Sequence, residues 1–155
     1  CPKSDRRLDV LPFYQEKLLL VMHPKHPLAH KKKVPIESLQ YQPFIHFEKD
    51  QPTRKLIDKL LRQYKITVKP VMELDNVETM KRGIEANVGI SILPEPAILQ
   101  ELKTGSLIAR PLEEEDFCRT VGAVYRKGKI LSEPVTRFLN LMRKPQTDIA
   151  AELQT

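Results

Sequence analysis

The chain has 155 residues, of which 41% are hydrophobic and 30% charged, and this composition is typical of a globular domain. Its formal net charge of +6 at pH 7 permits contact with nucleic acid but does not require it. No apolar run approaches the roughly 18 residues that a membrane-spanning helix needs, so we expect no membrane partner. The first residue is Cys1 and not Met, and we therefore expect a part of a longer protein.

The first half of the chain alternates apolar runs with polar turns. Leu18–Met22 predicts a strand buried on both faces and ended by Pro24. The segment "VPIESLQYQ" predicts a short helical turn, and Pro43–Phe47 a second strand that is followed by a polar loop. An amphipathic helix is predicted next, because apolar residues recur there at helical spacing, namely Leu56, Ile57, Leu60, Leu61 and Tyr64.

The middle of the chain repeats this alternation. Ile66–Leu74 is predicted to be extended, because it is rich in β-branched residues and contains Pro70. Asp75 is the predicted N-cap of a helix from about Asn76 to Ala86, with Glu78 completing a capping-box-like pair. The segment "VGISIL" predicts a buried strand that Pro94 stops.

The last third adds two helices and two strands. "EPAILQELKTG" predicts a helix with Pro96 in its first turn and Gly105 past its end. "SLIARPL" and "RTVGAVYR" predict strands, and Ser132 is expected to cap a final helix whose apolar face holds Val135, Phe138, Leu139 and Met142. Alternating strands and helices predict an α/β fold with a mainly parallel sheet covered by helices.

Three histidines, His23, His26 and His30, precede a run of three lysines and raise the possibility of a metal site. Pro24 and Pro27 prevent a helix from placing the imidazoles on one face. The neighbouring ammonium groups would repel a divalent cation, and the stretch contains no carboxylate. We expect a surface turn without a metal, and no cofactor elsewhere.

Catalysis is not expected either. The sequence contains no GxSxG, HExxH, P-loop or GxGxxG motif. Cys118 and His23 could form a nucleophile and base only if something oriented them, and no such residue is identifiable. Cys1 and Cys118 are the only cysteines and form no CxxC pair, so neither a disulfide framework nor a zinc ribbon is expected, and a reducing cytoplasm is the default location.

Four segments in order resemble the effector-binding domain of LysR-type transcriptional regulators: "EKLLLVMHPKHPLA", "PFIHF", "LDNVETMKRGIEANVGISILPEPA" and "RTVGAVYRKGKILSEPVTRFLNLM". The resemblance runs from about Leu8 to Met142. It implies a periplasmic-binding-protein-like (type II) lobe, with helices on both faces of a mixed sheet, plus remnants of a second lobe. It also implies that two antiparallel crossover strands join the lobes.

The resemblance implies the following division of the chain. Residues 1–14 would be a remnant of the first lobe, 15–22 a crossover strand, and 23–118 the second lobe. Residues 119–125 would be the return crossover strand, 126–144 the C-terminal helix of the first lobe, and 145–155 a flexible tail. The DNA-binding helices and most of the first lobe would be missing, so DNA contact would belong to the parent protein.

Candidate binding residues lie on two loops, because ligands of open α/β sheets sit beyond the carboxyl ends of strands. The first loop offers Gln51 and Thr53 as neutral donors and Arg54 as an anion clamp, and the corresponding loop in the family often contacts effectors. The second offers Asn76. Structural roles are open for these residues as well: Thr53 as an N-cap and Arg54 as a solvated side chain. Gly89 and Pro94 are expected to serve close packing and helix entry.

The resemblance implies that the chain senses a small-molecule effector for a LysR-type regulator. The helix N-termini and Arg54 favour an anionic effector. The effector would act by rearranging the lobes and the oligomer. The alternative is a solute-binding protein of a transport system, which shares the fold. We also expect self-association into a homo-oligomer, since the apolar stripe of Phe138, Leu139 and Met142 would otherwise be bare.

Overall fold

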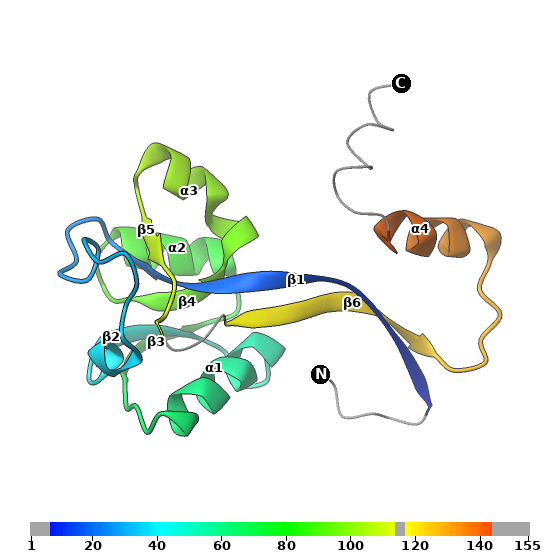
Figure 1. Ribbon diagram of the computed structural model, residues 1–155, viewed down its shortest axis with the longest axis horizontal. Coiled ribbons are helices and arrows are strands. Elements are labelled where there is room, and N and C mark those ends of the chain that lie inside the picture. Colours follow the sequence, from blue (N-terminus) through cyan, green and yellow to red (C-terminus); the bar gives the residue numbers. More distant parts are fainter. Residues whose placement is uncertain (1–6, 114–116, 144–155) are drawn as a thin grey trace. The chain divides into compact units, whose positions relative to one another are not determined.

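The computed structural model describes residues 7–113 and 117–143 (Figure 1). The chain divides into two compact units, one of residues Glu16–Arg119 and one formed by Cys1–Gln15 with Thr120–Thr155. The predicted tail at residues 145–155 lies outside the described residues.

A mixed sheet runs through the larger unit. β1 (Leu8–Met22) enters it and pairs antiparallel with β4 (Ser91–Pro94) and with β5 (Ile108–Arg110). β2 (Pro43–Phe47) and β3 (Lys69–Leu74) pair in parallel, and a parallel bridge between Phe44 and Ile90 connects β2 to the start of β4. The spatial order that follows is β3-β2-β4-β1-β5, in which β1 alone runs opposite to the other strands.

This topology corrects the expectation of a mainly parallel sheet. β1, which lies between β4 and β5, forms only antiparallel pairs with them. The sequence pattern could not show this, since an apolar run such as Leu18–Met22 reports burial on both faces and not the direction of the neighbouring strands.

Helices cover both faces of β2, as expected. Gly83 in α2 (Val77–Glu85) lies against the side chain of Ile45, whereas the next residue, His46, lies within the electrostatic influence of Arg54 and Asp58 in α1 (Pro52–Gln63). Neighbouring residues of a strand point to opposite faces, so α1 and α2 cover opposite sides of the sheet. Figure 1 shows β2 and β3 between these two helices.

The remaining elements of the larger unit are short. The predicted turn before β2 is a 3-10 helix, η1 (Ile36–Leu39). The helix predicted for "EPAILQELKTG" divides into a 3-10 turn, η2 (Glu95–Ile98), and α3 (Leu99–Thr104), and Gly105 ends it in the left-handed conformation with φ of 74°. A glycine adopts this conformation without the strain that a Cβ would cause.

Asp75 does not cap α2. The N-cap is Asn76, whose side-chain oxygen accepts hydrogen bonds from the backbone N–H groups of Glu78 (2.8 Å) and Thr79 (3.4 Å). Asp and Asn are both good N-caps, so two adjacent candidates could not be separated by residue type. The helix begins one residue later than predicted.

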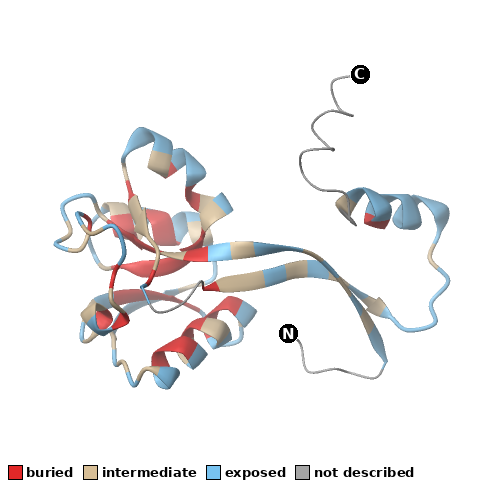
Figure 2. Ribbon diagram, viewed as in Figure 1, coloured by how far each residue is buried: buried red, intermediate tan, exposed pale blue. Residues whose placement is uncertain are grey.

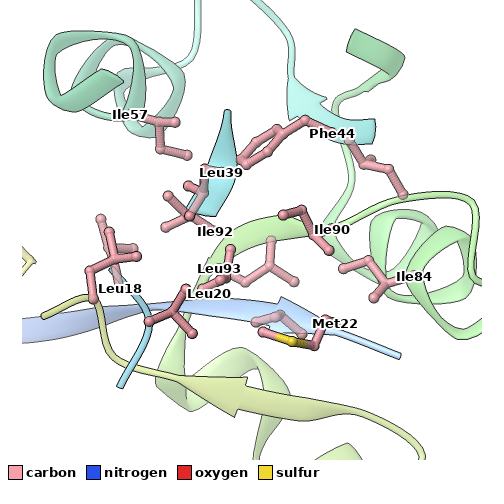
Figure 3. Packing of buried hydrophobic residues seen from close by; sticks show 14 of the residues in the cluster. Leu18, Leu20, Met22, Leu39, Phe44, Ile57, Ile84, Ile90, Ile92 and Leu93 are labelled. Atoms are coloured by element: carbon pink, nitrogen blue, oxygen red, sulfur yellow. The ribbon is translucent and has the colours of Figure 1, made fainter. Parts of the chain in front are cut away.

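One apolar core occupies the larger unit. Figure 3 shows Leu20 and Met22 of β1 together with Ile92 and Leu93 of β4 in this core, and Figure 2 shows that buried residues concentrate in the strands and on the inner faces of the helices. Gly89 confirms the expected close packing, because a Cβ at this position would lie 2.8 Å from the carbonyl oxygen of Pro43.

The smaller unit contains the outer half of β1, most of β6 (Cys118–Arg126) and α4 (Glu133–Arg143). The N–H of Lys127 donates to the carbonyl oxygen of Arg7, and Gly122 packs against the backbone of Leu11. These contacts fix an antiparallel pairing of β1 and β6. Ser132 precedes α4 as expected, and its carbonyl oxygen accepts the N–H of Thr136 at 3.0 Å.

Candidate functional site

The loops that follow β2 and β3 lie side by side in the larger unit. Parallel strands end at the same edge of a sheet, so the polar residues after Phe47 and after Leu74 are brought together. A hydrogen bond of 3.0 Å from the side-chain amide of Gln51 to the carbonyl oxygen of Asp75 links the two loops directly. The structure therefore places two predicted segments in one polar ledge, which we define as residues 48–54 and 75–76.

Gln51 is the N-cap residue of α1 and Asn76 that of α2. The Gln51 side chain makes no capping hydrogen bond and instead connects the loops. The Asn76 side-chain oxygen is occupied by the first turn of α2. Both helices begin at the ledge, so the positive ends of their dipoles lie there, although Asn76 already accepts hydrogen bonds from two N–H groups of α2 and Pro52 at the start of α1 has no N–H.

Thr53 is only 6% exposed and does not act as the N-cap of α1. Its hydroxyl oxygen accepts a hydrogen bond of 2.8 Å from Nη1 of Arg119, which lies in β6. The Nε and Nη2 atoms of Arg119 each lie 2.6 Å from the same carboxylate oxygen of Glu16 in β1. A chain of polar contacts thus extends from the ledge to two strands far away in the sequence.

Arg54 lies inside the protein, not on its surface. Its Nε bonds Asp58 at 2.9 Å, and its Nη1 donates to the carbonyl oxygen of Phe47 at 2.7 Å and lies 3.3 Å from Glu73. Two carboxylates therefore face one guanidinium, and that guanidinium also ties the end of β2 to α1. This arrangement suits a structural clamp better than an anion-binding group.

Sequence reasoning missed His46, which is 2% exposed and lies next to Arg54. Its Nδ1 has no hydrogen-bond partner among the described residues. Burial, and next the Arg54 charge, lower the pKa of His46 to about 4, while Asp58 and Glu73 act in the opposite direction. The imidazole is thus neutral near pH 7. A polar residue inside the apolar strand "PFIHF" was the available signal.

Arg119 and Glu16 were missed as site residues as well. The sequence offers no local signal for them, because Arg119 lies 66 residues from Thr53 and 103 residues from Glu16. Only the pairing of β1 with β6 brings them together.

The histidine-rich stretch forms a turn. Nδ1 of His23 accepts the N–H of Lys25 at 3.1 Å, and Nδ1 of His26 accepts the N–H of Leu28 at 3.3 Å. Burial lowers the pKa of His26, while a hydrogen bond with Gln42 opposes this shift. Within the described ranges, no group of three or more His, Cys, Asp or Glu residues is arranged to hold a metal ion.

Within residues 7–113 and 117–143, no helix combines the length and the apolar character that crossing a membrane requires.

Comparison with protein families identifies the class. Residues 1–146 match the family described as the LysR substrate binding domain, and the chain belongs to that family. It is 28% identical over 135 residues to a probable RuBisCO transcriptional regulator of Synechocystis, covering 85% of this chain and 39% of that protein. These curated relatives are named as transcriptional regulators, and the chain spans between 31% and 48% of their length.

Solved structures agree with this assignment. The regulatory domain of Synechocystis CcmR, determined in complex with 2-PG, is 28% identical and superposes with a TM-score of 0.85, covering 92% of this chain and 69% of that one. The effector-binding domain of QuiR, determined with shikimate, has 20% identity and a TM-score of 0.81 over 92% of this chain and 66% of that one, and it shows the shared fold. The predicted α/β fold of the type II periplasmic-binding-protein class is therefore confirmed.

Proposed function

We propose that this chain is the effector-sensing part of a LysR-type transcriptional regulator and that its polar ledge contributes to the effector site. The observation that carries the proposal is the joining of the loops after β2 and β3 by Gln51, beside two helix N-termini. Helix N-termini favour oxygen-rich, negatively charged ligands. The complexes of CcmR with 2-PG and of QuiR with shikimate support a small acid as the effector class.

The parent protein would use this binding to change the distribution between its conformations. An effector shifts such an equilibrium only to the extent that it binds one conformation more tightly than the other. Contact with DNA would come from a domain outside this chain, and the place of action would be the cytoplasm. A homo-oligomer would transmit the change. The transport alternative receives no support, since the relatives with assigned functions regulate transcription.

A ligand panel tests the proposal. The purified chain is titrated with 2-PG, shikimate and inorganic phosphate by calorimetry, and its melting temperature is followed in parallel. A ligand present at 100 times its Kd stabilises the folded state by about 2.7 kcal/mol. We expect at least one acid to bind with one site per chain.

Variants locate the site. Gln51→Ala and Thr53→Val remove a donor from the ledge and are expected to weaken binding about tenfold each, since a single hydrogen bond to a charged ligand is worth about 1.5 kcal/mol or more. Gln100→Ala, at an exposed position of α3, is the matched control and should bind like the wild type. Undiminished binding by both ledge variants would contradict this location of the site.

A further inference from the structure

The two arginines near the ledge differ in their free hydrogen-bonding capacity. Arg54 is 8% exposed and is held by two carboxylates and a backbone carbonyl. The side chain of Arg119 is 34% exposed, and it contacts Glu16 through Nε and Nη2 and Thr53 through Nη1. A guanidinium has five N–H groups, so two of those on Arg119 have no partner among the described residues.

The position of these free N–H groups matters. Glu16 engages the side of the guanidinium formed by Nε and Nη2, and its own side chain is 10% exposed. Each terminal nitrogen carries two hydrogens, so Nη1 and Nη2 each keep one. These two N–H groups lie on neighbouring nitrogens and can donate to the oxygens of a carboxylate or phosphate.

Thr53 adds a third donor beside this pair. Its oxygen accepts the hydrogen bond from Arg119, and its own proton has no acceptor among the described residues. A hydroxyl that accepts from a cation is polarised and becomes a better donor on its free side. Arg119 and Thr53 together offer donors on the side away from Glu16, and this combination favours a ligand rich in acceptor oxygens.

We propose that Arg119 binds the acid group of the effector, a carboxylate or a phosphate, together with the Thr53 hydroxyl, and that Glu16 is a positioning residue that orients the guanidinium. This inference rests on the proposed effector-sensing function and specifies its ligand class and its main cation. Arg54, the arginine favoured by sequence position, is the clamp of the loop and does not bind the ligand.

The test is a calorimetric titration of the full chain with 2-PG and with inorganic phosphate. Arg119→Gln should lower the affinity about tenfold to hundredfold, because it removes a charged, bidentate contact. Arg119→Lys keeps the charge without the fork and should recover only part of the affinity. Arg62→Gln, an exposed residue of α1 in the same unit, controls for net charge and should bind normally.

Removal of Arg119 also takes away the guanidinium that contacts the largely buried Glu16 carboxylate, and this change disfavours folding. The double variant Arg119→Gln/Glu16→Gln removes this conflict and should show the same loss of affinity at a near wild-type melting temperature. Glu16→Gln alone should weaken binding moderately, whereas Glu16→Asp, which retains a carboxylate, should restore part of it. The side-chain Nε–H resonance of Arg119 should shift on addition of 2-PG in the wild type.

The outcomes separate the two proposals. If the wild type binds an acid and the folded double variant binds it equally well, Arg119 is not a ligand-binding residue and this inference is overturned, while the effector-sensing function stands. If the wild type binds no acid of the larger panel, the proposed function fails, and this inference fails with it.

Discussion

His46 illustrates how a single buried residue couples this fold to pH. Burial and the neighbouring Arg54 lower its pKa to about 4, so the folded state disfavours the protonated imidazole. In the unfolded chain the same group takes up a proton near its ordinary pKa of about 6.5. Between these values the unfolded state binds more protons, and the folded protein therefore loses stability as the pH falls.

We predict that the free energy of unfolding decreases by about 2 kcal/mol between pH 7 and pH 5 because of His46 alone. Urea denaturation at several pH values measures this slope, and His46→Gln should flatten it. His30→Gln, at an exposed position, should keep the wild-type slope. If His46→Gln keeps the wild-type slope, protonation of this imidazole does not cause the loss of stability between pH 7 and pH 5.

Asn76 and Asp75 provide a second test at the level of single residues. Asn76→Ala should destabilise the protein by about 1 kcal/mol, because two N–H groups at the start of α2 lose their acceptor. Asp75→Ala should change little, since the contact that Asp75 makes in the described part of the chain, the hydrogen bond from Gln51, uses its backbone oxygen and not its side chain. Thermal denaturation measures the stability of both variants. A larger loss for Asp75→Ala than for Asn76→Ala would refute the assignment of Asn76 as the N-cap.

Among the helices, α2 and α3 are joined by a buried ion pair. Nζ of Lys81 lies 2.8 Å from carboxylate oxygens of both Glu101 and Glu78, and it donates to the carbonyl oxygen of Ala97 at 3.1 Å. Burial lowers the pKa of Lys81, but the hydrogen bonds to Glu101 and Glu78 outweigh it and the net shift is upward. The same bond lowers the pKa of Glu101, despite its burial.

We predict that Lys81→Met destabilises the larger unit by about 3–5 kcal/mol, because Glu101 would remain buried without its cation. The double variant Lys81→Met/Glu101→Leu should recover most of this loss, as an apolar pair needs no partner charge. Lys59→Met, at an exposed position of α1, is the control and should stay near wild type. Chemical denaturation measures the free energy of unfolding of all three variants. A double variant as unstable as Lys81→Met would argue against this explanation.

The same elements show how far the sequence predicts the structure. Leu18–Met22 and "PFIHF" were recognisable as strands because apolar residues filled both faces, and the helices were recognisable from their 3.6-residue period. The direction of each strand and its neighbours in the sheet could not be recognised, because pairing such as that of β1 with β4 joins residues far apart in the chain.

The candidate site was predictable to a similar extent. The two loops were found from their position after parallel strands, and Gln51 does join them. The role of each charged residue could not be predicted, because the ion pairs of Arg54 with Glu73 and of Arg119 with Glu16 form only in the folded chain. Residue type therefore indicated where the ledge lies, and packing decided which arginine keeps free donors.

On the scale of the whole molecule, the smaller unit leaves apolar surface uncovered. Val135, Phe138 and Leu141 of α4 are exposed, Phe138 to 57%, whereas Leu139 is buried. The predicted stripe of Phe138, Leu139 and Met142 is therefore only partly open to solvent. Exposed apolar residues repeated along a helix favour association.

We predict that the chain self-associates in a concentration-dependent manner and that Phe138→Asp shifts it towards the monomer. Light scattering coupled to size exclusion measures the mass at increasing concentration. Asn140→Asp introduces the same charge at an exposed position of α4 and should leave the mass unchanged. A wild-type chain that stays monomeric at high concentration would rule out this contact.

The pairing of β1 with strands much later in the chain has a consequence for biosynthesis. Leu18 pairs with Pro94, and Val21 pairs with both Ser91 and Ala109, so this early strand acquires its neighbours only after most of the larger unit has left the ribosome. Until then its leucines have no sheet to enter, and such distant pairings form slowly. A nascent chain stalled before residue 91 would expose the apolar, strand-forming segment Leu18–Met22, and chaperones bind segments of this kind.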